Sequence, residues 1–372
     1  MESFDEYEGL HAKCSHYIIL TASKGDCALS LTMPSSPSDQ NEVDSILLEE
    51  CEFRSAYKSN RVNWQLKDST FNVISDSQSH QQTVRRYGQA SCETPDGCLM
   101  ISGGFGVTEK GEHKRLNDVI VLHPNGVDHK QFELEKSKFN SRMHHSMDFL
   151  SGTLVIFGGR THPKNPLCDL ILYPFVTIDC QQDLHFFVYN DNSENYYVHP
   201  RPGRYRHTST AVEPSTLFIC GGLFTQGKLL DDCWQLDLSD WFADNTKSPK
   251  WSKFASLPSA RHSASLSHWE NQLILCGGLD KWEKVCSPQL LVANSTLGER
   301  SEWQQVNWNG PEPLPRYSHH TLVTKDNRLL LVGGTSSKWP SSLGVCIIQL
   351  GKWTCSEYCL PVTMRVLISQ DN

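Results

Sequence analysis

The chain has 372 residues, a formal net charge of -8 and a pI near 6.0. This charge excludes a globally basic nucleic-acid binder, although a local basic patch is compatible with it. No apolar run is long enough to predict a transmembrane helix. The 14 cysteines include no Cys-x-x-Cys pair and follow no signal peptide, so we expect free thiols in a reducing, cytoplasmic compartment.

The first segment, residues 1–29, has the pattern of a helix that leads into a strand. Leu10 and Cys14 lie at helical spacing after an acidic start, and Tyr17–Ser23 is an apolar, branched run. A piece of this size normally belongs to a larger α/β layer. We therefore expect a short α/β remnant of another domain at the amino terminus.

Residues 30–85 differ in composition from the segments on either side. The polar Pro/Ser stretch around residues 33–41 is typical of a linker, and weak alternation follows near residues 62–66 and 71–74. In ring-closed propellers a strand from one terminus often completes the blade that the other terminus begins. We expect a linker with candidate closing strands, in which Trp64 or Phe71 pairs with carboxy-terminal residues.

A repeated unit organises the chain from residue 86 onward. Each copy has an arginine, a short alternating run, a polar turn, an apolar run and a glycine pair. The copies run from Arg86 to Gly104, Arg142 to Gly159, Arg206 to Gly222, Arg261 to Gly278 and Arg316 to Gly334. The second glycines, at 104, 159, 222, 278 and 334, are therefore 55, 63, 56 and 56 residues apart.

The apolar runs before the glycine pairs predict buried strands, because they are short, branched and bounded by turn formers. A further strand is predicted 10 to 14 residues after each pair, in segments that begin at Asp118, Asp169, Asp232, Gln289 and Val345. Trp251, Trp303 and Trp353 suit an outer strand. Four short strands in a unit of this length predict an all-β, kelch-type β-propeller with five recognisable repeats over residues 86–360, followed by a tail at 361–372.

The sequence contains no sixth glycine pair. Either amino-terminal strands close the ring, or the chain is an incomplete version of a longer one. Both alternatives stay open at the level of the sequence.

The glycine pairs and the repeated Arg and His residues have a structural interpretation. Glycine adopts positive φ without strain, and crowding near a propeller axis disfavours a Cβ. The Arg and His side chains could be ligand groups around a channel. Pairing with backbone carbonyls and with the next blade is the simpler interpretation.

No metal or cofactor site is predicted from the residues alone. His144-His145 and His319-His320 are adjacent on strands, so their side chains point to opposite faces and do not share a metal. The segment nearest to a cofactor-binding loop is Gly103–Gly106, but a polar loop follows it where such a loop needs a helix.

Several stretches together resemble the tRNA wybutosine-synthesizing protein 4 family, also called the leucine carboxyl methyltransferase 2 family. They are residues 4–26, Arg86-Tyr-Gly-Gln-Ala-Ser, Arg316-Tyr-Ser-His-His-Thr and Leu329-Leu-Leu-Val-Gly-Gly. The resemblance covers nearly the whole chain. It implies that residues 1–29 are the carboxy-terminal edge of a methyltransferase domain and that the rest is a kelch domain.

The resemblance also implies a chemistry. Family members use S-adenosylmethionine to methylate, and with carbon dioxide to methoxycarbonylate, the side chain of the wybutosine precursor in phenylalanine tRNA. The cofactor-binding first part of the family's methyltransferase domain has no counterpart in these residues. We therefore expect no S-adenosylmethionine binding by this chain alone, and its catalytic residues and its status as an enzyme stay open.

The resemblance points to two groups of residues. The first matches the family's terminal methyltransferase motif and is expected to serve mainly in packing: Phe4, Asp5, Glu6, His16 and Tyr17. The second is the densest set of candidates for phosphate contacts with tRNA: Arg201, Arg204 and Arg206, or Lys110, Lys114 and Arg115. The alternative is a non-catalytic kelch scaffold that binds a protein partner through its propeller loops.

Overall fold

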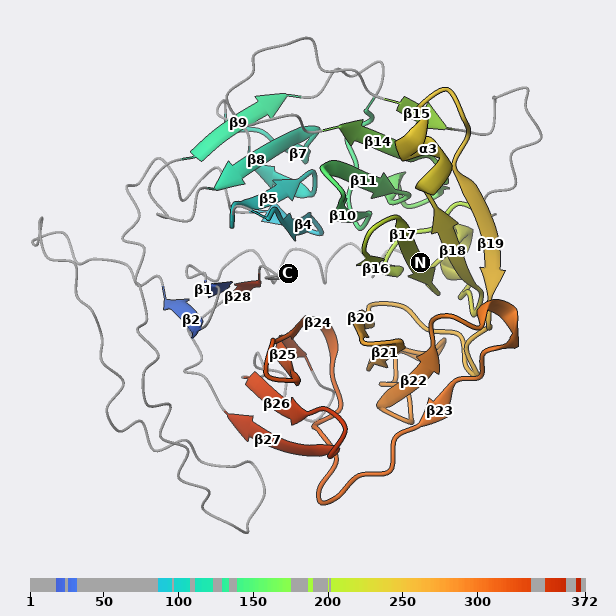
Figure 1. Cartoon of the computed structure of the whole chain (residues 1–372). Coiled ribbons are helices and arrows are strands. Elements are labelled where there is room, and N and C mark those ends of the chain that lie inside the picture. Colours follow the sequence, from blue (N-terminus) through green and yellow to red (C-terminus); the bar gives the residue numbers. More distant parts are fainter. Residues whose placement is uncertain are drawn as a thin grey trace, which may run out of the picture.

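The computed structural model describes residues 18–23, 26–31, 86–95, 97–107, 111–122, 129–133, 139–174, 187–189, 200, 202–335, 345–358 and 366–368. Within these ranges, five four-stranded antiparallel sheets surround a common axis as the blades of a propeller (Figure 1). The predicted all-β, kelch-type propeller is confirmed.

Each blade is one stretch of chain whose four strands follow one another from the axis outward (Figure 1). Blade 1 comprises β4 (Ala90–Glu93), β5 (Leu99–Ser102), β8 (Asp118–Leu122) and β9 (His129–Glu133). Blade 2 comprises β10 (Ser146–Leu150), β11 (Thr153–Phe157), β14 (Leu170–Pro174) and β15 (Phe187–Tyr189). Blade 3 comprises β16 (Thr208–Val212), β17 (Thr216–Cys220), β18 (Cys233–Asp237) and β19 (Lys250–Phe254).

The last two blades follow the same plan. Blade 4 comprises β20 (Ser265–Trp269), β21 (Gln272–Cys276), β22 (Leu290–Asn294) and β23 (Gln304–Gln305). Blade 5 comprises β24 (Tyr317–Val323), β25 (Arg328–Thr335), β26 (Val345–Gln349) and β27 (Thr354–Tyr358). Of the predicted outer-strand tryptophans, Trp251 lies in β19, whereas Trp303 and Trp353 directly precede β23 and β27.

The apolar core lies between neighbouring blades. Val119 of blade 1 clusters with Met147 of blade 2, and Leu275 of blade 4 clusters with Phe218 of blade 3. A blade face is therefore buried only by the next blade, as repeat architectures require. The cysteines before two glycine pairs, Cys220 and Cys276, are buried as predicted, and both are free thiols.

The glycine pairs are joints between blades. All ten glycines have positive φ, and Gly222 and Gly278 occupy equivalent positions after β17 and β21. The N–H of Gly222 donates to the carbonyl of Arg261 in the next blade at 2.9 Å. A Cβ at Gly221 would lie 2.5 Å from that same carbonyl oxygen. The pair is glycine because the neighbouring blade occupies the space of a side chain.

A buried arginine fixes the start of each repeat. Arg86 donates through Nη1 to the carbonyl of Gly103 at 3.0 Å and forms an ion pair with Asp118 at 2.7 Å. The other ion pairs of this kind are Arg142–Asp169, Arg204–Asp232 and Arg316–Glu357. The predicted repeat arginine of the third unit, Arg206, is therefore wrong, because Arg204 occupies this position.

Blade 4 departs from that pattern. Blade 4 has Gln289 directly before its third strand, β22. In the first three blades an aspartate begins the third strand or directly precedes it: Asp118, Asp169 and Asp232. Arg261 donates instead to the carbonyl of Gly277 at 3.0 Å and to the hydroxyl of Ser259 at 2.8 Å. Burial lowers the pKa of Arg261.

Histidines bond each of three blades to the blade before it. The Nε2 atoms of His145, His207 and His319 lie 2.6, 3.0 and 2.8 Å from the hydroxyls of Ser102, Ser146 and Ser265. The simpler interpretation of the repeated Arg and His residues, pairing with carbonyls and with the neighbouring blade, is confirmed. The two side chains of His144-His145 also separate, because only His145 turns toward Ser102.

A small terminal sheet lies between blades 5 and 1 (Figure 1). It joins β1 (Ile18–Ser23) to the antiparallel β2 (Asp26–Leu31) and to the parallel β28 (Val366–Ile368). The predicted strand at Tyr17–Ser23 is observed as β1. The predicted helix before it, and the candidate closing strands with Trp64 and Phe71, lie outside the described residues, so the division into 1–29 and 30–85 stays a prediction.

Helices are few and short in the described ranges. The α-helix α3 spans Ser239–Ala243, and η2 (Thr225–Gly227) and η3 (Gly298–Arg300) are single 3-10 turns. None of these helices has the length and apolar character needed to cross a membrane.

Candidate functional site

One end of the propeller is built from paired loops. In blade 1, β3 (Arg86–Tyr87) pairs with β6 (Phe105–Val107), and β6 pairs with β7 (His113–Arg115). Equivalent backbone bridges join Met143 to Arg160, Tyr205 to Leu223, and His262 to Leu279. We call this surface the loop face. It consists of two segments from each blade: one runs from the repeat arginine to the innermost strand, and the other runs from the glycine pair to the third strand.

An arc of backbone hydrogen bonds lies at the centre of the loop face. It runs through Gly88, His144, Arg206, Ser263 and Ser318, one residue from each blade, and we call it the axial arc. From His144 to Ser318, the N–H of each residue donates to the carbonyl of the one before it, which gives four bonds of 2.6 to 3.0 Å. All five have positive φ, between 52° and 67°, which is uncommon for residues other than glycine.

The side chain of Arg206 reaches from blade 3 to blade 1. Its Nη2 atom donates to the phenol oxygen of Tyr87 at 3.0 Å. Glu283 approaches from blade 4, where the interaction with His262 at 3.7 Å and the nearby Arg206 lower the pKa of its carboxyl. Tyr317 of blade 5 lies near the same groups, and burial followed by the Glu283 charge raises the pKa of its phenol. We call Tyr87, His144, Arg206, Glu283 and Tyr317 the axial mouth.

His144 fills the side of the axial mouth that belongs to blade 2. Its ring meets Tyr87 edge-on at 5.1 Å and lies 6.4 Å from Tyr205. Burial, followed by the charges of Arg206 and Arg160, lowers the pKa of His144 well below its ordinary value. The imidazole is therefore neutral at neutral pH, and Arg206 and Glu283 supply the charges of the mouth.

Aromatic side chains project from the loop face. The fractional exposure is 37% for Tyr87, 39% for Phe105 and 68% for Trp282, and these are three of the four exposed large hydrophobic side chains in the described ranges. Trp282 lies at the tip of a tight hairpin in which the carboxylate of Asp280 accepts from the N–H groups of Trp282 and Lys284. The aromatic surface is therefore held on rigid backbone.

Basic side chains outnumber acidic ones on the described part of the loop face. The exposed or half-exposed basic residues are Lys114, Arg115, Lys164, Arg206, Lys228, Lys281 and Lys284. The acidic ones are Glu112, Asp169, Asp231, Asp232, Asp280 and Glu283. The charges of Asp169 and Asp232 are balanced by the buried Arg142 and Arg204. An acidic chain thus carries a local basic surface, which is the arrangement that binding to an anionic polymer requires.

The predicted tRNA contacts have different outcomes. Arg204 is fully buried and bound to Asp232 at 2.7 Å, so that prediction is wrong: its guanidinium cannot reach a phosphate. Arg206 lies in the axial mouth, and Lys114 and Arg115 lie on the loop face. The remaining predicted positions lie outside the described residues: Arg201, Lys110, Phe4, Asp5, Glu6, His16 and Tyr17.

The glycine-rich segment that comes nearest to a cofactor-binding loop does not fit S-adenosylmethionine. Gly103 and Gly104 run directly into β6, and a Cβ at Gly103 would lie 2.7 Å from the carbonyl oxygen of Arg142. The next blade therefore occupies the space that a cofactor would need beside these glycines. In the described ranges, no three His, Cys, Asp or Glu side chains are grouped to hold a metal ion.

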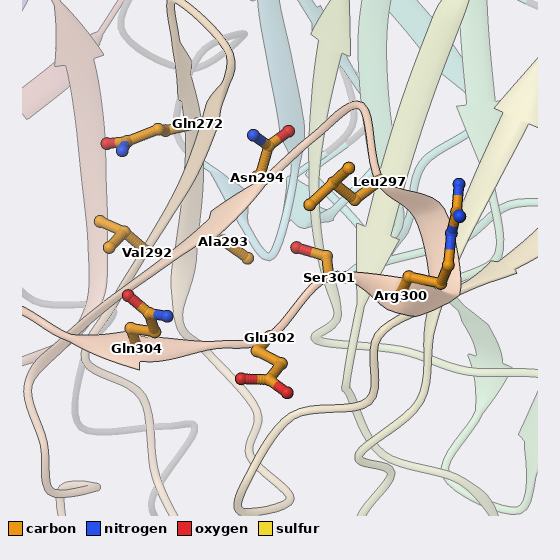
Figure 2. A pocket seen from close by; sticks show the side chains of 9 residues that line it. All are labelled: Gln272, Val292, Ala293, Asn294, Leu297, Arg300, Ser301, Glu302 and Gln304. Atoms are coloured by element: carbon orange, nitrogen blue, oxygen red, sulfur yellow. The ribbon is translucent and has the colours of Figure 1, made fainter.

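A second hollow lies away from the loop face, on the outer edge of blade 4 (Figure 2). It has a volume of about 240 Å³. Its lining residues are Gln272, Val292, Ala293, Asn294, Leu297, Arg300, Ser301, Glu302 and Gln304. The hollow exists because β23 pairs only with Leu291 and Val292, which leaves the end of β22 uncovered by an outer strand. Arg300 and Glu302 carry opposite charges at its rim.

Comparison with known proteins agrees with this architecture. Residues 176–359 match the family model described as the KLHDC2/KLHL20/DRC7 Kelch-repeats domain. The chain is a kelch-repeat protein. The solved structure of YjhT has a TM-score of 0.54 and 15% identity, and the match covers 73% of this chain and 83% of that one. At this identity the likeness shows the fold alone.

Two relatives match almost all of this kelch-repeat chain. It is 30% identical to human tRNA wybutosine-synthesizing protein 4 over 98% of its length, and 30% identical to the rat protein of the same name over 96%. The chain spans about half the length of each, 50% and 49%. Kelch-like protein 40 of Xenopus tropicalis is 27% identical over 43% of the chain.

Proposed function

We propose that this chain is the tRNA-binding kelch part of a wybutosine-synthesizing system, and that its loop face binds phenylalanine tRNA in the cytoplasm. Two relatives named tRNA wybutosine-synthesizing protein 4 match nearly its whole length, which supports the substrate class. The observation that carries the proposal is the loop face, which combines excess basic charge with exposed aromatic rings on a chain of net charge -8.

Both features suit an anticodon loop. Lys and Arg side chains bind RNA phosphates, and their contribution to affinity decreases as salt rises. Unpaired bases of RNA loops stack on aromatic side chains, whereas bases in a duplex are not available for this. The loop face offers Tyr87, Phe105 and Trp282 for stacking and lysines such as Lys114 and Lys284 for phosphate contacts.

The proposal assigns binding to this chain and the methyl and methoxycarbonyl transfer chemistry to a methyltransferase domain of the kind in the resembled family. S-adenosylmethionine would supply the methyl group there. The propeller would hold a large anionic substrate while that domain acts on one modified base. The crowding at Gly103 and Gly104 supports this division, because it leaves no space for the cofactor beside these glycines.

Charge reversal on the loop face tests the proposal. The double variant Lys114→Glu/Lys284→Glu removes two exposed cations of the loop face. Phenylalanine tRNA should bind at least about 10-fold more weakly, and the slope of log K against log salt should become shallower by about 1.4 to 1.8, because each of the two phosphate contacts contributes about 0.7 to 0.9. Fluorescence anisotropy over a salt series measures both quantities.

The matched control reverses two exposed lysines at the opposite end of the propeller. Lys325 lies in the turn between β24 and β25, and Lys352 lies in the turn between β26 and β27. Lys325→Glu/Lys352→Glu should leave both the affinity and the slope unchanged. Equal effects of the two double variants would show that net charge, and not the loop face, determines binding.

Binding of a protein partner is the second candidate function. Trp282 is 68% exposed on a rigid hairpin, and an exposed aromatic residue of this kind is typical of protein interfaces. Other relatives, such as Kelch-like protein 40, carry kelch repeats without a tRNA name. This candidate replaces the first if the wild-type chain shows no salt-dependent binding of tRNA.

A further inference from the structure

We propose that Tyr87 and Arg206 form a site for one unpaired nucleotide of single-stranded RNA. The base stacks on the exposed face of the Tyr87 ring, and the adjoining phosphate binds the Arg206 guanidinium. This inference rests on the proposed function, because it specifies which part of an RNA the loop face recognises. In this arrangement the residues at the propeller axis recognise an unpaired nucleotide, and the lysines around the axis attract RNA phosphates without distinguishing single strands from duplexes.

Arg206 is positioned to hold an anion. Its backbone is fixed in the axial arc, since its N–H donates to the carbonyl of His144 at 3.0 Å and its carbonyl accepts from the N–H of Ser263 at 2.9 Å. The bond to Tyr87 uses one of the five N–H donors of a guanidinium. A planar, half-exposed guanidinium held in this way suits a phosphate oxygen pair.

Tyr87 supplies a stacking platform directly beside that guanidinium. Its phenol oxygen accepts the bond from Arg206, and its ring contacts His144 edge-on, so two contacts fix the ring while 37% of the residue remains exposed. Stacking of a base on an aromatic side chain contributes about 1 to 3 kcal/mol. The distance of 3.0 Å between the two side chains places base and phosphate sites within one nucleotide.

Glu283 gives the site a measurable signature. Its carboxylate is ionised at neutral pH, since its contact with His262 at 3.7 Å and the nearby charge of Arg206 lower its pKa. A phosphate that binds Arg206 must therefore approach a negative charge. Removal of that charge should increase RNA affinity, which is an effect that a purely structural role for the Arg206–Tyr87 pair does not produce.

The experiment uses the full chain and a fluorescein-labelled 12-nucleotide RNA, single-stranded or annealed to its complement, measured by anisotropy. Arg206→Gln and Tyr87→Leu should each weaken single-strand binding about 5-fold or more, from the loss of at least about 1 kcal/mol. Tyr87→Phe keeps the ring and should change the affinity for the single strand less than about 2-fold. Glu283→Gln should increase that affinity about 2-fold or more. The affinity for the duplex should respond weakly to all four variants.

Three results overturn the inference. The first is unchanged single-strand binding by Arg206→Gln when its melting temperature matches the wild type. The second is a Glu283→Gln variant that binds single strands no more tightly. The third is tighter binding of a labelled hepta-glutamate peptide than of the RNA, which would identify the axial mouth as a site for acidic peptides.

The lysine variants separate this inference from the proposed function. If Arg206→Gln and Tyr87→Leu have no effect but Lys114→Glu/Lys284→Glu weakens tRNA binding, the nucleotide site is wrong and the loop-face proposal stands. If the wild-type chain binds no tRNA, the proposed function fails and the nucleotide site fails with it. Tyr87→Phe is the stability control for these variants, because it preserves the packing of the ring.

Discussion

Two alanine substitutions can test whether crowding by the next blade determines the glycine at the joint between blades 4 and 5. Both place an alanine in left-handed backbone. Gly277 and Gly333 are the first glycines of their pairs, with φ of 59° and 69°. A Cβ at Gly277 would lie 2.1 Å from the carbonyl oxygen of Arg316, whereas a Cβ at Gly333 would meet no described atom within 4 Å. The pair therefore separates backbone strain from crowding by the next blade.

The magnitude follows from these distances. Left-handed backbone costs an alanine about 1 to 2 kcal/mol at either position. At Gly277 the Arg316 carbonyl must also move by about 1 Å, which costs about 1 to 3 kcal/mol as overpacking and weakens the 3.1 Å hydrogen bond from Gly278. We expect Gly277→Ala to be less stable than Gly333→Ala by about 2 to 4 kcal/mol.

Equilibrium unfolding in urea measures this difference, with a thermal melt as a second readout. For a chain of this size, 1 kcal/mol corresponds to about 2 to 4 °C, so the two melting temperatures should differ by about 5 to 10 °C. Equal losses of stability in the two variants would refute the argument, because strain alone would then explain the glycine and the neighbouring blade would have no part in it.

Four further predictions follow from charges and from the glycine-rich segment. Burial raises the pKa of Asp148 to about 6, so its ionisation destabilises the fold as pH rises from about 4 to 6. Asp148→Asn should therefore raise the melting temperature at pH 7.5, with a gain in unfolding free energy of at most about 3 kcal/mol, and should change it little at pH 4. An effect that is independent of pH would contradict this. Burial lowers the pKa of His207 to about 3, so stability is lost as pH falls below about 6.5; His207→Gln should flatten this loss in melts between pH 6.5 and 4, and an unchanged pH profile would count against it. Gln289→Asp should give Arg261 the carboxylate that the other repeats have, and raise the melting temperature by a few degrees; a lower melting temperature would show that blade 4 has adapted to the amide. Calorimetry should detect no binding of S-adenosylmethionine to the purified chain, and micromolar affinity would reveal a site that the described residues do not contain.

The sequence predicts the blades because their determinants are local. The next blade excludes a Cβ at the first glycine of the first four pairs, and the pairs recur at a nearly constant interval, so Gly222 and Gly278 indicate equivalent positions before any contact is known. The third strands follow from the same register: the segment predicted from Asp118 is β8 without a shift. The error at Arg204 has a simple cause, since Arg204-Tyr-Arg206 offers two arginines within the observed spacing and only burial distinguishes them.

The axial mouth could not be predicted from a single repeat, because each blade contributes only one side chain to it. The direction of the Arg206 side chain depends on its positive φ, which no composition pattern reveals for a residue other than glycine or asparagine. One signal was available: the position two residues after each repeat arginine. Alignment on Arg204 brings Gly88, His144, Arg206, Ser263 and Ser318 into one column.

The axial arc has an evolutionary consequence. Its bonds join backbone N–H and carbonyl groups, so the linkage of successive blades at the axis does not depend on which side chain stands at each position. Glycine, histidine, arginine and serine all occupy equivalent places in this one molecule. Mutations at these five positions can therefore change what the axis recognises while the backbone scaffold remains the same, and a propeller of this kind can acquire a new ligand without building a new fold.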